Sequence, residues 1–179
     1  MEYHSPVLLK ESVGGLNIKQ DGVYVDVTFG GGGHSKEILE SLGTKGRLIA
    51  FDQDKDALLN VIDDPRFLLI SENFRFMQRF LRFHGVKAVD GILADFGVSS
   101  HQFDEPERGF SIRFDAMLDM RMNQQDVLSA HSLVNTYEEE ALRQVFWQYG
   151  ELRTAPVLAK TIVQARQIAS IDTLSLIHI

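Results

Sequence analysis

Four consecutive glycines at residues 30–33 separate an apolar run, residues 23–27, from a short amphipathic segment that starts at His34. A glycine-rich turn between a buried strand and a helix lets backbone N–H groups approach a ligand closely, because glycine has no Cβ. Such a turn is typical of a nucleotide-cofactor loop in an α/β sheet. A glycine run alone is equally typical of a flexible surface turn, so the rest of the chain must decide between the two.

Short apolar runs alternate with amphipathic segments over the first hundred residues. The pattern predicts strands over residues 23–27, 47–51, 67–70 and 89–94. It predicts helices over residues 34–42, 55–62 and 74–84, and an N-terminal helix that Ser5 caps and Pro6 opens. Strands that alternate with helices form a parallel sheet, so the expected fold class is α/β, a Rossmann-like doubly wound sheet.

The pattern changes after Ser100. Residues 101–126 are polar, rich in charge and methionine, and lack a period of two or 3.6, which indicates a long functional loop. From residue 127 the pattern is helical, with a predicted capping box of Thr136 and Glu139 and a further helix opened by Pro156. The second half is therefore predicted to be an α-helical subdomain.

Acidic and aromatic residues follow the predicted strands. Asp52 stands nineteen positions after Gly33, where a carboxylate accepts hydrogen bonds from cofactor ribose hydroxyls. The glycine loop together with this acid leaves NAD and S-adenosylmethionine as alternative cofactors. A strict dinucleotide fingerprint has glycine or alanine at position 35, so the serine there counts mildly against NAD. Asp95 faces the expected ligand crevice or caps a turn. Phe74 walls an adenine ring or belongs to the core.

The net charge of −7 argues against nucleic-acid binding over the whole surface, because phosphate attraction needs a basic footprint. Local patches remain as candidates, with solvated faces as the alternative interpretation. They are Arg75, Arg79, Arg82 and Lys87 in one region, and Arg108, Arg113 and Arg121 in another.

Several classes of protein are disfavoured. The chain has no cysteine, so it has neither a disulfide framework nor a thiolate zinc site, and its six histidines lack ligand spacing. We therefore expect no metal. The first residues lack the charged and apolar regions of a targeting signal, and no apolar run approaches the roughly 20 residues that span a bilayer. We expect a cytoplasmic protein without membrane association.

Six blocks together resemble the RsmH (MraW) family: residues 4–9 (HSPVLL), 26–35 (DVTFGGGGHS), 51–54 (FDQD), 91–100 (GILADFGVSS), 107–111 (ERGFS) and 118–122 (LDMRM). Members of this family are bacterial methyltransferases that modify N4 of a cytidine in 16S ribosomal RNA, near the P site. The resemblance implies S-adenosyl-L-methionine as cofactor and 16S rRNA in the small ribosomal subunit as partner. It covers residues 4–174.

The resemblance also assigns site residues. The family's cofactor positions correspond to Gly32, Gly33, His34, Asp52, Phe74, Asp95 and Gln102. Asp95 is in addition expected to be catalytic, by fixing the geometry of the target amine. The chain departs from the family at Gly31, usually arginine, and at Phe96, usually leucine. Departures also occur at His101, usually proline, and at Ala116-Met117, commonly Gly-Pro; all of these bear on loop shape more than on the identity of the cofactor.

Family members are longer, with a helical domain inserted into the sheet and the last strands after it. The resemblance therefore implies an N-terminal part of the S-adenosylmethionine-binding domain at residues 1–104. Residues 105–179 are then an incomplete inserted substrate-recognition subdomain, and the final strands are missing. Two alternatives stay open: an NAD-dependent oxidoreductase, which the glycine loop and acid alone allow, and a non-catalytic RNA-binding fragment.

Overall fold

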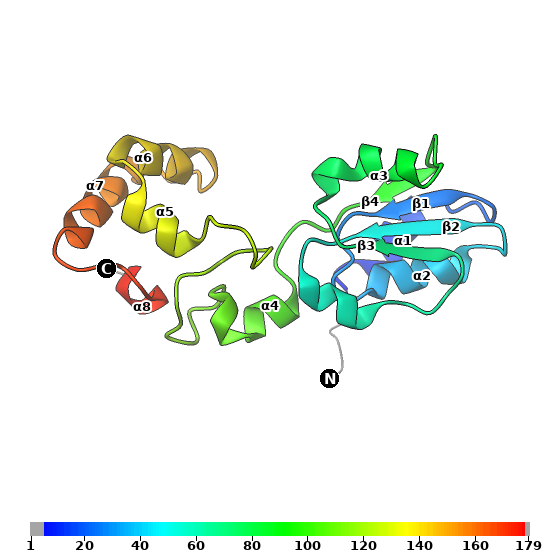
Figure 1. Ribbon diagram of the computed structural model, residues 1–179, viewed down its shortest axis with the longest axis horizontal. Helices are drawn as coiled ribbons and strands as arrows, with labels where there is room; N and C mark the ends of the chain where they lie inside the picture. The colour runs from blue at the N-terminus through cyan, green and yellow to red at the C-terminus, as the bar shows by residue number, and fades with distance from the viewer. Residues whose placement is uncertain (1–5, 178–179) are drawn as a thin grey trace. The chain divides into compact units, whose positions relative to one another are not determined.

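The computed structural model describes residues 6–177. The chain divides into two compact units, Met1–Ser100 and His101–Ile179, seen in Figure 1. The finer division at residue 104, with a cofactor domain before it and an inserted subdomain after it, stays a prediction. The predicted helix cap Ser5 lies outside the described residues.

The first unit is built on a four-stranded parallel sheet. Its strands are β1 (Val23–Asp26), β2 (Arg47–Phe51), β3 (Phe67–Ile70) and β4 (Gly91–Leu93), in the order β3-β2-β1-β4. In the register of the sheet, Val25 lies opposite Ile49 of β2 and Ile92 of β4. The chain winds outward from β1 to β3 and then returns to the other side of β1, which confirms the predicted doubly wound α/β class. Ligands of such sheets bind at the carboxyl ends of the strands where the order reverses, here β1 and β4.

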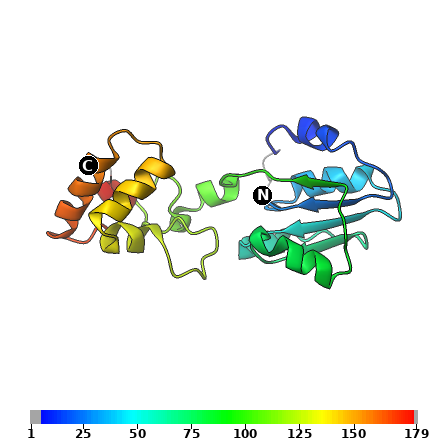
Figure 2. The ribbon, with the colours of Figure 1, turned by 90° about the horizontal axis from the view of Figure 1, so that it is seen from above.

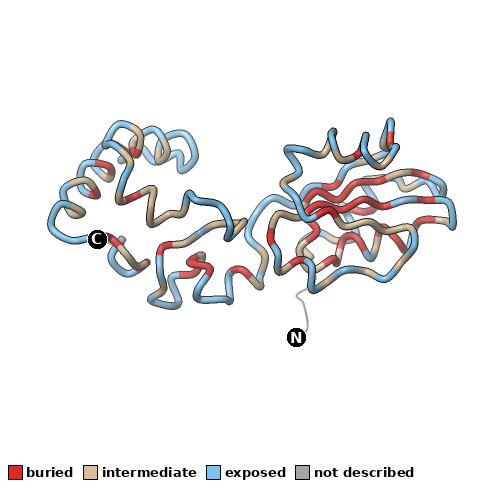
Figure 3. Tube along the Cα trace, in the orientation of Figure 1, coloured by how far each residue is buried: buried red, intermediate tan, exposed pale blue. Residues whose placement is uncertain are grey.

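Helices cover both faces of the sheet, as Figure 2 shows: α1 (Leu9–Gly15) and α2 (Gly33–Ser41) on one, α3 (Met77–Phe83) on the other. Successive strand residues point to opposite faces. Tyr24 and Leu48 accordingly pack with α1 and α2, whereas Val25 and Ile49 pack with α3. The two central strands, β1 and β2, are mostly buried and are drawn mostly in red in Figure 3.

Several element boundaries differ from the predictions; β4, for example, covers residues 91–93 and not 89–94. The segment predicted as a helix over residues 55–62 is a 3-10 helix, η1 (Lys55–Asn60), because Ala57 is its single buried residue and no apolar stripe stabilises a longer α-helix. The helix predicted over residues 74–84 begins as a 3-10 turn, η2 (Phe74–Phe76), before α3. The first helix starts at Leu9, since Leu8 has a left-handed φ of 52°.

The second unit is helical. Its elements are α4 (Ser100–Asp104), η3 (Pro106–Arg108), α5 (Ala130–Thr136), α6 (Glu139–Gln148), α7 (Ala155–Arg166) and α8 (Leu174–Ile177). Leu118, Val134, Leu142 and Ile162 form its core. Pro156 lies in the first turn of α7, as predicted. No helix among residues 6–177 is both long and apolar enough to cross a membrane.

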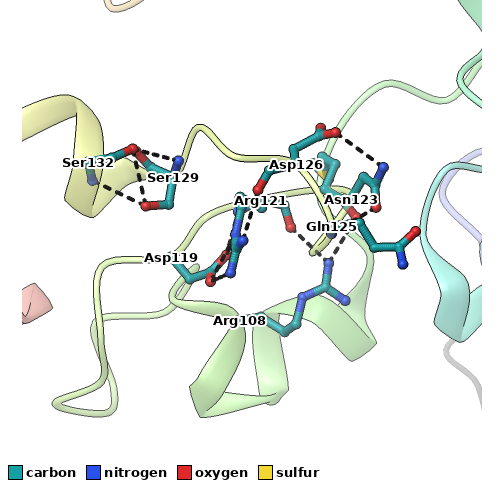
Figure 4. A network of polar contacts seen from close by, with 9 residues as sticks. Arg108, Asp119, Arg121, Asn123, Gln125, Asp126, Ser129 and Ser132 are labelled. Atoms are coloured by element: carbon teal, nitrogen blue, oxygen red, sulfur yellow. Dashed lines mark hydrogen bonds and ion pairs between the residues drawn. The ribbon is translucent and has the colours of Figure 1, made fainter.

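The predicted capping box of Thr136 and Glu139 is wrong. Thr136 ends α5, and its hydroxyl donates to the carbonyl of Ser132 at 2.7 Å. A capping box instead opens α5, as Figure 4 shows. The Ser129 hydroxyl accepts from the Ser132 backbone N–H at 3.1 Å, and the Ser132 hydroxyl accepts from the Ser129 backbone N–H at 2.9 Å. A serine at the third helical position thus replaces the glutamate that the sequence pattern requires.

Gly109, which ends η3, has a φ of 70°, and a Cβ there would lie 2.6 Å from the carbonyl oxygen of Met117. Gly85 has a φ of 73° but nothing within 4 Å of such a Cβ. Gly85→Ala should therefore cost only the left-handed strain, about 1–2 kcal/mol of unfolding free energy. Gly109→Ala should cost about 3 kcal/mol or more, because backbone must also move. Chemical denaturation measures both; equal losses would contradict the packing argument.

Candidate cofactor site

The loop between β1 and α2 has two left-handed glycines, Gly30 with φ 51° and Gly32 with φ 77°. A Cβ on Gly32 would lie 3.0 Å from the Phe29 ring, and one on Gly33 would lie 2.3 Å from Cγ of Pro6. A Cβ on Gly30 would meet nothing within 4 Å. Packing therefore requires glycine at positions 32 and 33, whereas the open side of Gly30 leaves room for a ligand against the backbone.

Asp52, directly after β2, holds this loop. Its Oδ2 accepts a hydrogen bond from the Gly30 N–H at 2.7 Å, and its Oδ1 accepts from the Asp54 N–H at 2.9 Å. Asn60 donates to the Gly30 carbonyl at 3.1 Å. Burial raises the pKa of Asp52 despite these bonds. Each carboxylate oxygen has two lone-pair sites, so the carboxylate retains acceptor capacity for ribose hydroxyls. The structure thus brings the predicted acid to the predicted loop.

Asp26, the last residue of β1, is fully buried beneath the same loop. Its Oδ1 accepts from the Thr28 N–H at 3.0 Å, and its Oδ2 accepts from the Ser35 hydroxyl at 2.7 Å. These bonds fix both ends of the glycine loop. This role of Asp26 was not predicted from the sequence. The available signal was an acid inside an apolar run, since a buried carboxylate persists only where hydrogen bonds compensate its lost hydration.

Desolvation raises the pKa of Asp26 above its ordinary value of 3.8. The native carboxyl therefore holds its proton more tightly than the unfolded one, and the free energy of unfolding should fall as pH rises from about 4 through the native pKa. Asp26→Asn, with a neutral side chain of the same shape, should lack this fall. The stability of the variant relative to wild type should thus increase with pH over that interval.

Chemical denaturation at a series of pH values measures this difference. Asp63, an exposed carboxylate of the same unit, provides the control. Asp63→Asn should follow the wild-type pH profile. Parallel profiles for wild type and Asp26→Asn would contradict a raised native pKa.

His34, in the first turn of α2, is buried. Its Nδ1 lies 4.0 Å from Oδ2 of Asp95. Its Nε2 is buried and has no hydrogen-bond partner among residues 6–177. Buried polar atoms normally have a partner, so a polar ligand group that reaches Nε2 would gain a hydrogen bond there.

Asp95 follows β4, and its side chain is 52% exposed. Its backbone N–H donates to the Thr28 hydroxyl at 2.8 Å. This bond joins the loop after β4 to the loop after β1, at the point where the strand order reverses. The Asp95 carboxylate is therefore held at the carboxyl edge of the sheet, near His34 and the glycine loop.

Phe74 follows β3 and lies outside the core, with 38% of its surface exposed. Its ring centroid is 5.6 Å from that of Phe96, which follows β4. Since β3 and β4 are the two edge strands, the ring pair bridges the loops that leave opposite edges of the sheet. The interpretation of Phe74 as a core residue is wrong. At the base of the same loop, Asn73 donates to Gln53 at 2.6 Å, which links the ends of β3 and β2.

Gln102 lies in the second unit, where it is buried in α4. Its place in the site stays a prediction. The other six predicted residues all belong to the first unit, around the carboxyl edge of its sheet. Residues 6–177 contain no group of three or more histidine and acidic side chains arranged for a metal ion.

Two arginines of the second unit, Arg108 and Arg121, serve the fold, as Figure 4 shows; Arg113 is exposed and pairs with Asp104 at 3.1 Å. Arg108 is buried, and its Nη2 donates to the carbonyls of Arg121 and Met122 at 3.0 and 3.2 Å. The Arg121 guanidinium pairs with Asp119, lowers the pKa of that carboxyl and donates to the Asp126 carbonyl at 2.9 Å. Burial contradicts a phosphate-contact role for Arg108, and Arg121 pairs internally.

Comparisons with known proteins identify a family and several relatives. The sequence pattern of the MraW methylase family matches residues 1–178. The ribosomal RNA small subunit methyltransferase H of Flavobacterium johnsoniae is 70% identical over 173 residues, which cover 97% of this chain and 57% of the relative. Proteins of the same name from Christiangramia forsetii and Bacteroides thetaiotaomicron are 68% and 59% identical, with the same coverage of each chain. The chain thus spans 57% of the length of these curated relatives.

Proposed function

The chain belongs to the MraW methylase family, and we propose on that basis that it forms part of an enzyme that methylates N4 of a cytidine in 16S rRNA. The identity of 70% to a ribosomal RNA small subunit methyltransferase is the observation that carries the proposal. We propose the P-site region of the small ribosomal subunit as the location of the target. An enzyme with this substrate works in the cytoplasm.

The geometry of the first unit supports S-adenosylmethionine as the cofactor. The open side of Gly30 accommodates a ligand against the loop, and Asp52 retains acceptor capacity for ribose hydroxyls. His34 offers a buried Nε2 atom to a polar group. Phe74 supplies an exposed ring for the adenine. Gly32 and Gly33 keep the loop in shape, and Gln102 completes the proposed set of cofactor residues.

S-adenosylmethionine supplies, when bound, a methyl group on a sulfonium that is already activated for transfer. The chain must then hold the target amine in line with that group, and such orientation contributes roughly 7–11 kcal/mol in favourable cases. The cytosine N4 is a weak nucleophile, because its lone pair is delocalised into the ring. The base must also be unpaired to present this edge.

Asp95 is the proposed acceptor for an N4–H of the target. Its backbone is fixed by Thr28, and its carboxylate is half exposed at the carboxyl edge of the sheet. A hydrogen bond from N4–H to this carboxylate localises the nitrogen lone pair and orients it. In the proposed division, residues 1–104 supply this chemistry and residues 105–179 belong to a substrate-recognition subdomain.

The test uses the complete protein and small ribosomal subunits from a strain that lacks the modification. S-adenosylmethionine with a tritiated methyl group should label one cytidine of the 16S rRNA at N4. S-adenosylmethionine should raise the melting temperature of the protein, and NAD should not. A melting shift with NAD alone would indicate an oxidoreductase. RNA binding without label would indicate a non-catalytic RNA-binding protein.

A further inference from the structure

The segment that contains η2 and α3 is basic. Residues 73–89 contain four cations and no aspartate or glutamate, in a chain of net charge −7. We call five exposed residues the basic-aromatic face: Arg75, Phe76, Arg79, Arg82 and Phe83. No ion pair joins its arginines to any side chain within residues 6–177. Their charge is therefore not neutralised locally.

Helical spacing arranges this face. Met77, Phe80 and Leu81 pack against the sheet and turn the opposite side of α3 outward, where the tube of Figure 3 is mostly pale blue. Arg79 and Arg82 are three residues apart on α3, and Arg75 lies in the 3-10 turn η2 directly before it, so the three arginines form one row along this segment. Phe76 is the last residue of η2 and Phe83 is the last residue of α3, so the two phenylalanines belong to the same segment as the arginines.

The aromatic rings of the face are available for stacking. Phe83 is 81% exposed and Phe76 is 39% exposed. The Arg75 guanidinium carbon lies over the Phe76 ring, 4.6 Å from its centroid, in a cation–π contact. A side chain as exposed as that of Phe83 contributes little to the packing of the fold, so packing does not explain why a phenylalanine stands at this position. Exposed rings interleaved with arginines are the combination with which proteins bind single-stranded nucleic acid.

We propose that the basic-aromatic face binds a single-stranded segment of ribosomal RNA next to the target cytidine. The arginine row contacts phosphates, and the rings of Phe76 and Phe83 stack on unpaired bases. The row begins one residue after Phe74 of the cofactor site, so a strand bound along it leads to the carboxyl edge of the sheet. The inference rests on the proposed function, because it specifies how that substrate is held.

The first test is charge removal. The triple variant Arg75→Gln/Arg79→Gln/Arg82→Gln of the complete protein is compared with Lys36→Gln/Lys45→Gln/Arg47→Gln, which removes the same charge from exposed positions elsewhere in the first unit. Dissociation constants for protein-free 16S rRNA and for small subunits are measured at several salt concentrations. The face variant should bind both at least about tenfold more weakly, with a log–log salt slope smaller by about 2, or about 0.7 for each lost phosphate contact. The control should stay within about twofold of wild type.

The second test is ring removal. Phe83→Leu keeps an apolar side chain of similar size but cannot stack, and it should weaken RNA binding about fivefold or more. Leu59→Ala removes an equally exposed apolar side chain from η1 and should leave binding unchanged. Neither change touches the core, so melting temperatures should stay at the wild-type value.

The same samples separate failure of the face from failure of the proposed function. Wild-type RNA affinity and salt slope in the face variants, with methyl transfer by wild type intact, would overturn the inference alone. Lost affinity for subunits but not for protein-free 16S rRNA would also overturn it, because the face would then contact a ribosomal protein. If wild type transfers no methyl group while the variants of the basic-aromatic face still lose RNA affinity, the proposed function is wrong and the inference that this face binds RNA is supported.

Discussion

Asp52→Ala is expected to weaken S-adenosylmethionine binding by about 10² to 10⁴-fold. The carboxylate lies beside the open side of Gly30 and retains acceptor sites for two ribose hydroxyls. Hydrogen bonds to a charged group contribute about 1.5–3 kcal/mol each, and two of them correspond to this loss of affinity. The N–H groups of Gly30 and Asp54 also lose their acceptor, which should lower the unfolding free energy by about 1–3 kcal/mol.

Calorimetric titration of the complete protein with S-adenosylmethionine measures the affinity, and chemical denaturation measures the stability. Asp52→Asn retains one acceptor oxygen and should give an intermediate affinity. Asp63→Asn, which removes an exposed charge outside the site, should match wild type in both measurements. An Asp52→Ala protein that is destabilised but binds normally would show that Asp52 only anchors the loop.

The sheet was largely predictable from the sequence because its strands are continuous apolar runs. Residues 47–51 and 67–70 form β2 and β3 as predicted, since a strand of a covered parallel sheet is recognisable as an apolar run that ends in a turn. The position of Asp52 at the same edge of the sheet as the glycine loop was also expected, because parallel strands bring their carboxyl ends to one edge. Local pattern and topology thus sufficed for the main features of the site.

The missed features depend on partners distant in sequence. Phe74 has the helical spacing of a core residue, but it pairs with Phe96 from the opposite edge of the sheet. Arg108 is an ordinary surface residue by type, yet the loop of Arg121 and Met122 buries it and uses its donors. No local pattern encodes such pairs. The role of Asp26 likewise depends on Ser35, nine residues away, with which it shares a hydrogen bond only once α2 has packed.

Asp95→Asn in the complete protein is expected to lower the turnover of methyl transfer by about 10² to 10⁴-fold, the range associated with a positioned acid-base group. The amide keeps the shape of the carboxylate, and the backbone bond to Thr28 is unaffected. What it loses is the negative charge that strengthens a hydrogen bond from N4–H. Binding of S-adenosylmethionine should weaken less than about tenfold, because the Asp52 carboxylate and the glycine loop remain in place.

Single-turnover methylation of small subunits at saturating S-adenosylmethionine separates the two roles of Asp95. A residue that only binds cofactor would show wild-type turnover once the cofactor saturates. A residue that orients the target amine leaves turnover low at any cofactor concentration. Asp63→Asn again serves as the matched loss of a carboxylate. A high concentration of S-adenosylmethionine cannot compensate for the loss of a contact made in the transition state. Full recovery of turnover in Asp95→Asn at saturating S-adenosylmethionine would therefore disprove that Asp95 orients the target amine, and would leave Asp95 as a cofactor ligand.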